Sequence, residues 1–231
     1  MIEAHELTKR YGDTIAVHSL SFTIAPGTVT GFLGPNGAGK STTMRMIMGL
    51  DRPTSGTVTV NGKPYRQHRS PLREVGGLLE ASAVHPGRSA RSHLRTMAAT
   101  HNIKASRVSE VIEMTGLAGV ATKRVGGFSL GMGQRLGIAA ALLGDPRTLI
   151  LDEPVNGLDP EGVQWVRQLV RAPGRRRTNR LPLLAPDERD LPDRRPAPGD
   201  RPRSHHRRRP GPAGHRLRRR RRCAGALPAR R

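Results

Sequence analysis

The sequence has few cysteines and no long apolar run, and each shortage excludes a class of protein. Its single cysteine, Cys223, excludes an internal disulfide and any metal site built from several cysteines. No window approaches the roughly 18 to 20 consecutive apolar residues that a membrane helix needs, and the N-terminus lacks the apolar stretch of a signal peptide. We therefore expect any membrane contact to run through a partner.

Acidic residues are also scarce, because 18 Asp and Glu stand against 40 Lys and Arg in 231 residues, for a formal net charge of +22. This excess is unevenly placed. Residues 1–171 carry a net charge of +7, whereas residues 172–231 contain 20 Arg, no Lys and 5 acidic residues, for a net charge of +15. The length suits one globular domain, yet the charge indicates two unlike segments.

Residues 1–171 alternate between the apolar patterns of strands and helices. The run at 28–33 ends abruptly at glycine, and proline at the start of 160–170 suits the first turn of a helix. We expect strands over 17–22, 28–33, 56–61, 75–79 and 148–151, and helices over 40–50, 106–114, 131–143 and 160–170. This order predicts an α/β fold.

A glycine-rich segment between the second strand and the first helix carries the strongest functional signal. It matches the pattern G-x-x-x-x-G-K-[ST] with Gly34, Pro35, Asn36, Gly37, Ala38, Gly39, Lys40, Ser41 and Thr42. Backbone N–H groups of such a loop converge on phosphates, and the following helix adds its positive end. Lys40 is expected to reach the β and γ phosphates, the Ser41 hydroxyl to ligate Mg²⁺, and Thr42 to bond phosphate. The alternative is a glycine-rich turn that binds nothing.

A second segment supplies two carboxylates after an apolar strand. Residues 148–151 are followed by Asp152 and Glu153. One carboxylate can enter the shell of Mg²⁺, and the other can polarise a water molecule. Alone, the pair could equally be an ordinary surface Asp-Glu pair, and the phosphate loop favours the functional interpretation.

Residues 128–136, Phe-Ser-Leu-Gly-Met-Gly-Gln-Arg-Leu, resemble the signature sequence of ABC transporter ATPases in the bacterial branch that exports drugs and antibiotics. The alternative is a helix start capped by a serine. The resemblance implies a P-loop NTPase (RecA-like) core with an antiparallel β part and a helical subdomain over about 85–145. It also implies a second ATP-binding subunit, paired head to tail, whose bound γ-phosphate meets Ser129, Gly131 and Gln134 of this chain.

Other positions fall into the register of the same family. By resemblance, Tyr11 stacks on adenine, Glu153 is the catalytic base, and residues 156–159 form the loop that follows it. Glu80 stands where the family has a glutamine that touches Mg²⁺ and the membrane partner, and a carboxylate can still bind that ion. The family implies ATP and Mg²⁺ as ligands, an integral membrane permease as partner, and a cytoplasmic position on the inner face of the membrane.

Residues 172–231 do not match the family. They contain ten Pro, six Leu and no Val, Ile, Met, Phe, Trp or Tyr, too few apolar residues to offset chain entropy, so we expect a disordered tail. The family requires a further strand that ends in a histidine contacting the γ-phosphate. His205, His206 and His215 lie in Arg/Pro-rich sequence without such a strand. We therefore expect slow or absent hydrolysis.

We hypothesise that a frameshift near Arg171 produced the tail. Reading the codons one nucleotide later permits a β-prone segment followed by a histidine across the codons of Ala185 and Pro186, and GC-rich codons read out of frame also yield the arginines. Two alternatives stay open, a gene product without function and a soluble ATPase whose genuine basic arm binds nucleic acid or acidic lipid. Because the tail lacks aromatic residues for stacking on bases, nucleic acid is the less favoured partner.

Overall fold

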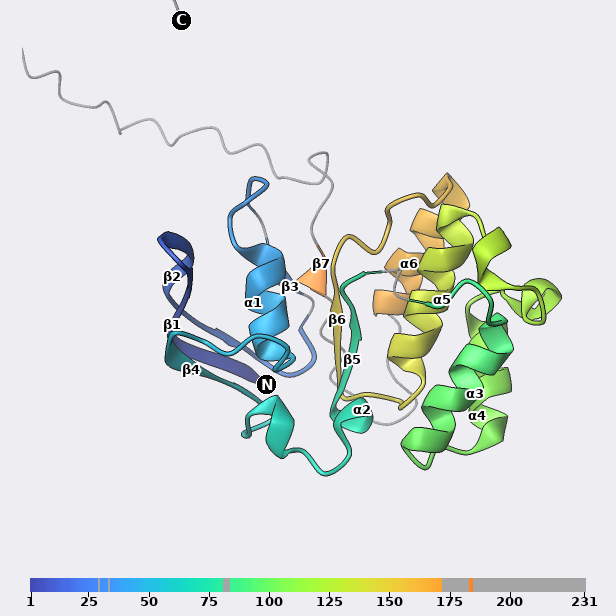
Figure 1. Cartoon of the computed structure of the whole chain (residues 1–231), viewed down its shortest axis with the longest axis horizontal. Helices are drawn as coiled ribbons and strands as arrows, with labels where there is room; N and C mark the ends of the chain where they lie inside the picture. Colours follow the sequence, from blue (N-terminus) through green and yellow to red (C-terminus); the bar gives the residue numbers. More distant parts are fainter. Residues whose placement is uncertain (29, 33, 81–83, 172–182, 185–231) are drawn as a thin grey trace, which may run out of the picture. The chain divides into compact units, whose positions relative to one another are not determined.

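A computed structural model describes residues 1–28, 30–32, 34–80, 84–171 and 183–184 (Figure 1). In chain order the strands are β1 (Ile2–Tyr11), β2 (Thr14–Ile24), β3 (Thr30–Gly31), β4 (Ser55–Val60), β5 (Val75–Leu78), β6 (Thr148–Leu151) and β7 (Leu183–Leu184). The helices are α1 (Lys40–Ile47), α2 (Pro71–Glu74), α3 (Ala90–Thr100), α4 (Ala105–Met114), α5 (Leu130–Leu142) and α6 (Pro160–Arg171), with short 3-10 turns at Tyr65–Gln67, Ala118–Val120 and Val125–Gly127. The predicted α/β order is confirmed.

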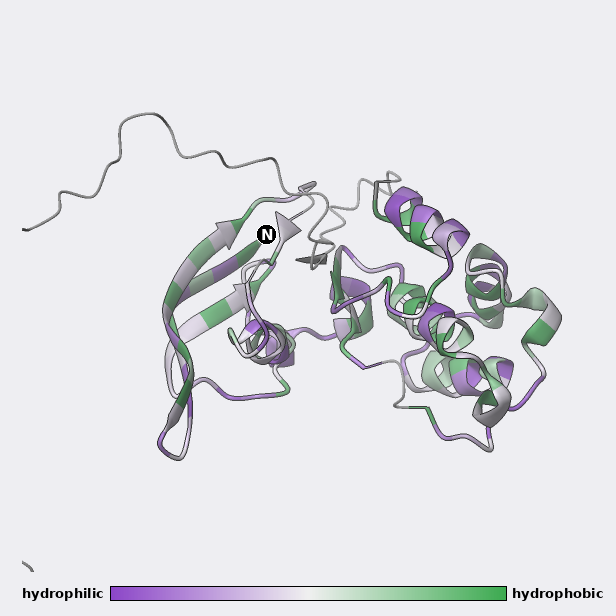
Figure 2. Cartoon of the chain, turned by 90° about the horizontal axis from the view of Figure 1, so that it is seen from above, coloured by the Kyte–Doolittle hydropathy of each residue, from purple (hydrophilic) through white to green (hydrophobic). Residues whose placement is uncertain are grey.

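Three strands from the first sixty residues form an antiparallel sheet in the order β2-β1-β4. Strand β1 was not predicted, and the reason is a bulge. Ala4 and Leu7 both point into the core, but Glu6 between them has a φ of 47° and the strand register shifts there. Because a bulge changes the parity of the side-chain alternation, the period-two pattern that marks a strand is lost. Figure 2 shows hydrophobic and hydrophilic residues interleaved along this sheet.

Strands β5 and β6 form a parallel pair, and Asp152 and Glu153 directly follow β6. β5 pairs with β6 in register, Val75 opposite Thr148 and Leu78 opposite Leu151, and all four residues of β6 are buried. Because parallel strands end at the same edge, the residues that follow Leu78 and Leu151 emerge together. The backbone N–H of Asp152 donates to the carbonyl of Leu78 over 2.8 Å, which continues the ladder to that edge.

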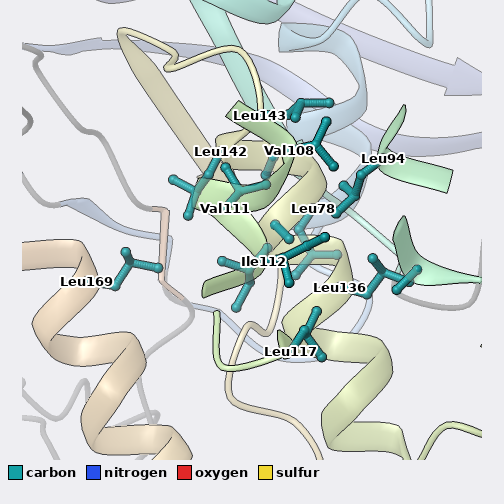
Figure 3. Packing of buried hydrophobic residues seen from close by; sticks show 14 of the residues in the cluster. Leu78, Leu94, Val108, Val111, Ile112, Leu117, Leu136, Leu142, Leu143 and Leu169 are labelled. Carbon is teal, nitrogen blue, oxygen red and sulfur yellow. The ribbon is translucent and has the colours of Figure 1, made fainter. Parts of the chain in front are cut away.

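Helices α3, α4 and α5 pack together around an apolar core (Figure 3). Each of α3 and α5 begins with a serine whose side chain accepts a backbone N–H, Ser89 from Ser92 and Ser129 from Met132. Leu94, Ile112 and Leu136 are fully buried in this core, and burying such a side chain stabilises a fold by about 1.5–3 kcal/mol. In the described parts of the chain, every helix is too short or too polar to span a lipid bilayer.

The segment expected to be disordered contains β7, which requires a correction at two positions. Leu183 and Leu184 pair in parallel with Thr30 and Gly31 of β3, and β7 also lies beside β6. The physical reason is that an open strand edge presents unpaired backbone N–H and C=O groups, and the backbone of this pair of residues can complete the edge of β3. The remaining residues from 172 to 231, His205, His206 and His215 among them, lie outside the described residues.

Candidate functional site

The phosphate loop joins β3 to α1, which begins at Lys40. Gly39 stands before the helix with a φ of 80°, and a Cβ at this position would lie 2.2 Å from the carbonyl oxygen of Ala16. Only glycine can adopt this left-handed backbone and also lie so close to the Ala16 carbonyl, because it has no Cβ. The loop walls a cavity of about 190 Å³, lined by Ala16, Asn36, Gly37, Ala38, Gly39, Lys40, Ser41, Thr42 and Glu153.

The Lys40 side chain folds back onto backbone carbonyls of the loop. Its ammonium group donates to the carbonyl oxygens of Gly34 at 2.6 Å and Pro35 at 3.0 Å. These are neutral acceptors, so the positive charge remains available to an anion in the cavity. Together with the N-terminus of α1, this makes the cavity suited to phosphate.

Ser41 and Asp152 meet across 111 positions of sequence, because the Ser41 hydroxyl donates to the Asp152 carboxylate over 2.6 Å. One side chain comes from the start of α1 and the other from the end of β6. A hydroxyl and a carboxylate are hard oxygen ligands of the kind that Mg²⁺ takes, so the residues present fit this ion. Glu80 is exposed beyond the end of β5 and is not among the described residues that line the cavity.

Glu153, which lines the cavity, has an unusual backbone conformation. Its φ of 46° lies in the left-handed region, where a residue other than glycine is held by its surroundings. Its carboxylate accepts a hydrogen bond from the Asn156 side-chain amide, and its carbonyl oxygen accepts one from the Asn156 N–H over 3.2 Å. These contacts aim an exposed carboxylate at the phosphate loop, where it can take a proton from a water molecule.

The signature-like segment begins α5 at an exposed position. Ser129 is the exposed N-cap, and Leu130 after it is 66% exposed. Gly131 packs so closely on the loop after Glu153 that a Cβ there would lie 2.8 Å from the carbonyl oxygen of Gly157. The segment and that loop are therefore in direct contact.

The resemblance assigns Gln134, with Ser129 and Gly131, to the nucleotide of a second subunit. Within this chain Gln134 is 5% exposed, and its side-chain amide donates to the carbonyl oxygen of Glu153 over 3.0 Å. The physical reason is helical periodicity, since Gln134 shares the inward face of α5 with Ile138 and Ala141, which are both buried. Gln134 is therefore bonded within its own chain.

Tyr11 lies outside the cavity lining, at the end of β1, with 48% of its surface exposed. Its hydroxyl donates to Asp51 over 2.7 Å, and the Lys9 ammonium lies 4.7 Å from the centre of its ring. Sequence reasoning missed Asp51, and no sequence signal links two residues forty positions apart. It also gave Asn156 no role, although Asn156 lies in the predicted loop after Glu153.

The family model and the curated relatives that match this chain are all of one kind, ABC transporter ATP-binding proteins. The family model described as ABC transporter matches residues 17–156. The chain is 44% identical over 174 residues to the bacitracin transport ATP-binding protein BcrA of Bacillus licheniformis, an alignment that covers 74% of this chain and 57% of that protein. It is 36% identical to the lantibiotic transport ATP-binding protein SrtF of Streptococcus pyogenes, with 74% of both chains covered. The chain thus spans little more than half the length of its bacitracin relative.

Among solved structures, the chain is similar to the ATP-binding cassette MJ0796 in a dimeric post-hydrolysis state bound to ADP and Pi. The TM-score is 0.72 at 22% identity, over 81% of this chain and 88% of that one, a likeness that shows the fold. It is also similar to cbiO1 of Clostridium perfringens, described as part of an ABC transporter complex. That TM-score is 0.66 at 28% identity, over 80% of this chain and 78% of that one.

Proposed function

Since the chain belongs to the ABC transporter family, we propose that it is the ATP-binding subunit of a transporter and binds MgATP at the phosphate loop. The observation that carries this proposal is one cavity lined by the loop residues from Asn36 to Thr42 and by Glu153. Beside it, Ser41 is hydrogen-bonded to Asp152. Loop amides, a lysine, hard oxygen ligands and a carboxylate are the groups that phosphoryl transfer requires.

Each group has a role in this proposal. The amides from Gly34 to Gly39 and the Lys40 ammonium hold the phosphates, and Thr42 adds a hydrogen bond. Ser41 and Asp152 would hold Mg²⁺, with Glu80 as a third oxygen ligand, and the ion would neutralise phosphate charge. Glu153 accepts a proton from the attacking water, and Tyr11 stacks on adenine.

The proposal includes two partners. The exposed start of α5, with Ser129 as its cap, suits the phosphate of a nucleotide held by a second, head-to-tail subunit, because Ser129 and the Gly131 amide form an anion-binding end of a helix. The other partner is an integral membrane permease that nucleotide-driven closure would operate. The names of the bacitracin and lantibiotic relatives support export of a drug or antibiotic as the transported class.

We expect this chain to hydrolyse ATP slowly. Strand β7 lies beside both β3 and β6. In the sequence the two following residues are Ala185 and Pro186, whose side chains neither donate nor accept hydrogen bonds. The family's histidine contact to the γ-phosphate therefore has no counterpart at this point of the sequence.

Titration calorimetry of the full chain with MgATP tests the binding step. The wild-type chain is expected to bind, and Lys40→Ala to weaken binding at least about tenfold, because it removes a charge-assisted bond to phosphate. Lys123→Ala is a matched control that removes an exposed lysine of the helical region. A wild-type chain that does not bind MgATP, or a Lys40→Ala chain that binds as tightly, would overturn the proposal.

A further inference from the structure

A small polar network ties the end of β1 to the phosphate-loop helix. The Tyr11 hydroxyl donates to Oδ2 of Asp51 over 2.7 Å, and the Arg45 guanidinium of α1 donates to both oxygens of the same carboxylate, at 2.9 and 3.2 Å. A guanidinium that grips both carboxylate oxygens fixes the plane of the acceptor as well as its position. Asp51 therefore presents a fixed oxygen to Tyr11.

Asp51 is the more enclosed member of its ion pair. Its side chain is 17% exposed, against 47% for Arg45, and its backbone N–H donates to the Arg45 carbonyl over 3.3 Å. The next residue is held from the other side, because the Lys9 ammonium donates to the Arg52 carbonyl over 2.8 Å. Surface ion pairs are often worth little because both side chains move, but here the backbone around Asp51 is tied to both α1 and β1.

The charges of the network agree with its geometry. Hydrogen bonds from Arg45 and then from Tyr11 lower the pKa of Asp51, so the carboxylate stays ionised. The bond to Asp51 raises the pKa of Tyr11, against smaller opposing effects of the Arg45 charge and then of the Thr42 hydroxyl. Tyr11 is therefore a neutral donor. It lies near the hydroxyl of Thr42, the last residue of the phosphate loop.

One ring face of Tyr11 is already in use. The Lys9 ammonium lies 4.7 Å from the ring centre, a cation–π arrangement that occupies one side of a ring. The opposite face is the one that can receive a flat partner. A ring fixed at its hydroxyl and on one face loses little further freedom when a base stacks on the other, and such preorganisation favours binding.

We propose that Asp51 is a positioning residue for adenine, holding the Tyr11 ring in the orientation in which the base of a phosphate-bound nucleotide stacks on it. The inference rests on the proposed function, in which the phosphate loop binds ATP and Tyr11 meets its base. It adds that base recognition depends on an acid outside the loop. Because Arg45 belongs to α1, the same helix that starts at the phosphates with Lys40 anchors the base contact at its other end.

Two probes separate base binding from phosphate binding. Calorimetry of the full chain with MgATP reports both, whereas inorganic tripolyphosphate with Mg²⁺ reports the phosphate loop alone. For Asp51→Ala we expect MgATP affinity to fall about threefold to tenfold, the size of the net contribution of one ordinary hydrogen bond, and tripolyphosphate affinity to stay within about twofold. Asp13→Ala, an exposed acid in the turn after Tyr11, removes the same charge as a matched control and should leave both unchanged.

A second variant keeps the test independent of any folding defect in Asp51→Ala. Tyr11→Phe retains the stacking ring and loses the hydroxyl, so it should weaken MgATP binding by the same factor, and Asp51→Ala added to it should cost less than about twofold more. Equal losses for both probes, additive effects of the two variants, or no loss in either variant would overturn the inference and leave the proposed function standing. A wild-type chain that binds neither probe would overturn both.

Discussion

The side-chain amide of Gln134 donates a 3.0 Å hydrogen bond to the backbone carbonyl of Glu153, joining the signature-like helix to a residue that lines the phosphate-loop cavity. Gln134 is 5% exposed, and Glu153 has a φ of 46°. A residue other than glycine keeps such a backbone only when its surroundings hold it. Gln134 is one of the groups that hold Glu153 there.

Replacing Gln134 with Met should lower the free energy of unfolding by about 1–3 kcal/mol, because a side chain of similar length would leave the Glu153 carbonyl without this donor. Urea denaturation measures the change. Gln164→Met makes the same exchange at an exposed position of α6 and should stay within about 0.5 kcal/mol of wild type. Equal effects at the two positions would show that the Gln134 bond contributes nothing.

Two glycines of the phosphate loop offer a second comparison. Gly39 and Gly37 have similar φ values, 80° and 85°, but a Cβ on Gly39 would lie 2.2 Å from the Ala16 carbonyl oxygen, whereas a Cβ on Gly37 would meet nothing within 4 Å. Gly37→Ala should therefore cost about 1 kcal/mol of stability through backbone strain alone. Gly39→Ala should cost at least about 2 kcal/mol, because the loop must also move.

Thermal unfolding and MgATP titration of the two glycine variants check this expectation. Gly39→Ala should also lose nucleotide binding, since the displaced backbone belongs to the cavity wall. If the two variants were equally stable and bound MgATP equally well, the close approach of Gly39 to Ala16 would contribute neither to stability nor to binding.

Half-buried His93 on α3 should make stability depend on pH. Burial lowers the pKa of His93 from 6.5, and Arg88 lowers it further. The unfolded chain therefore holds this proton more tightly than the folded chain, so the stability associated with neutral His93 is complete above pH 6.5 and is lost as the pH falls below it.

Chemical denaturation at pH 7.5 and 5.5 measures that dependence. His93→Gln, which does not titrate, should show a smaller loss of unfolding free energy between the two pH values than wild type. His101→Gln, at the exposed end of the same helix, is the control and should keep the wild-type difference. The same pH dependence in wild type and His93→Gln would contradict the assignment to His93.

The sequence after Arg171 makes a genetic prediction. Resequencing the codons for Val163 to Arg189 should reveal one base gained or lost, and a chain expressed in the shifted frame should carry a histidine at the codons of Ala185 and Pro186, directly after β7. The rate of phosphate release from MgATP should then rise about 100-fold, because one hydrogen-bond donor to a developing charge changes a rate by about that factor. An unchanged frame would mean that the Arg-rich ending is genuine.

Sequence pattern predicted much of the fold, and particular residues show why the rest escaped. Strands β5 and β6 and helices α4 and α5 begin and end within a few residues of their expected bounds, because their apolar spacing reflects a buried face. Strand β1 was missed because the bulge at Glu6 breaks its alternation of side chains. Helix α3 was predicted only as part of the helical subdomain over about 85–145. β7 escaped because two leucines among arginines and prolines make no pattern.

By itself the sequence determined the phosphate loop, the Asp152–Glu153 pair and the family resemblance, because each depends on residues a few positions apart whose order sets local backbone chemistry. Only the tertiary structure decided which distant side chains meet. It placed Ser41 against Asp152, Tyr11 against Asp51, and the Gln134 side-chain amide against the Glu153 carbonyl. Those contacts depend on strand register and helix packing, which no short stretch of sequence encodes.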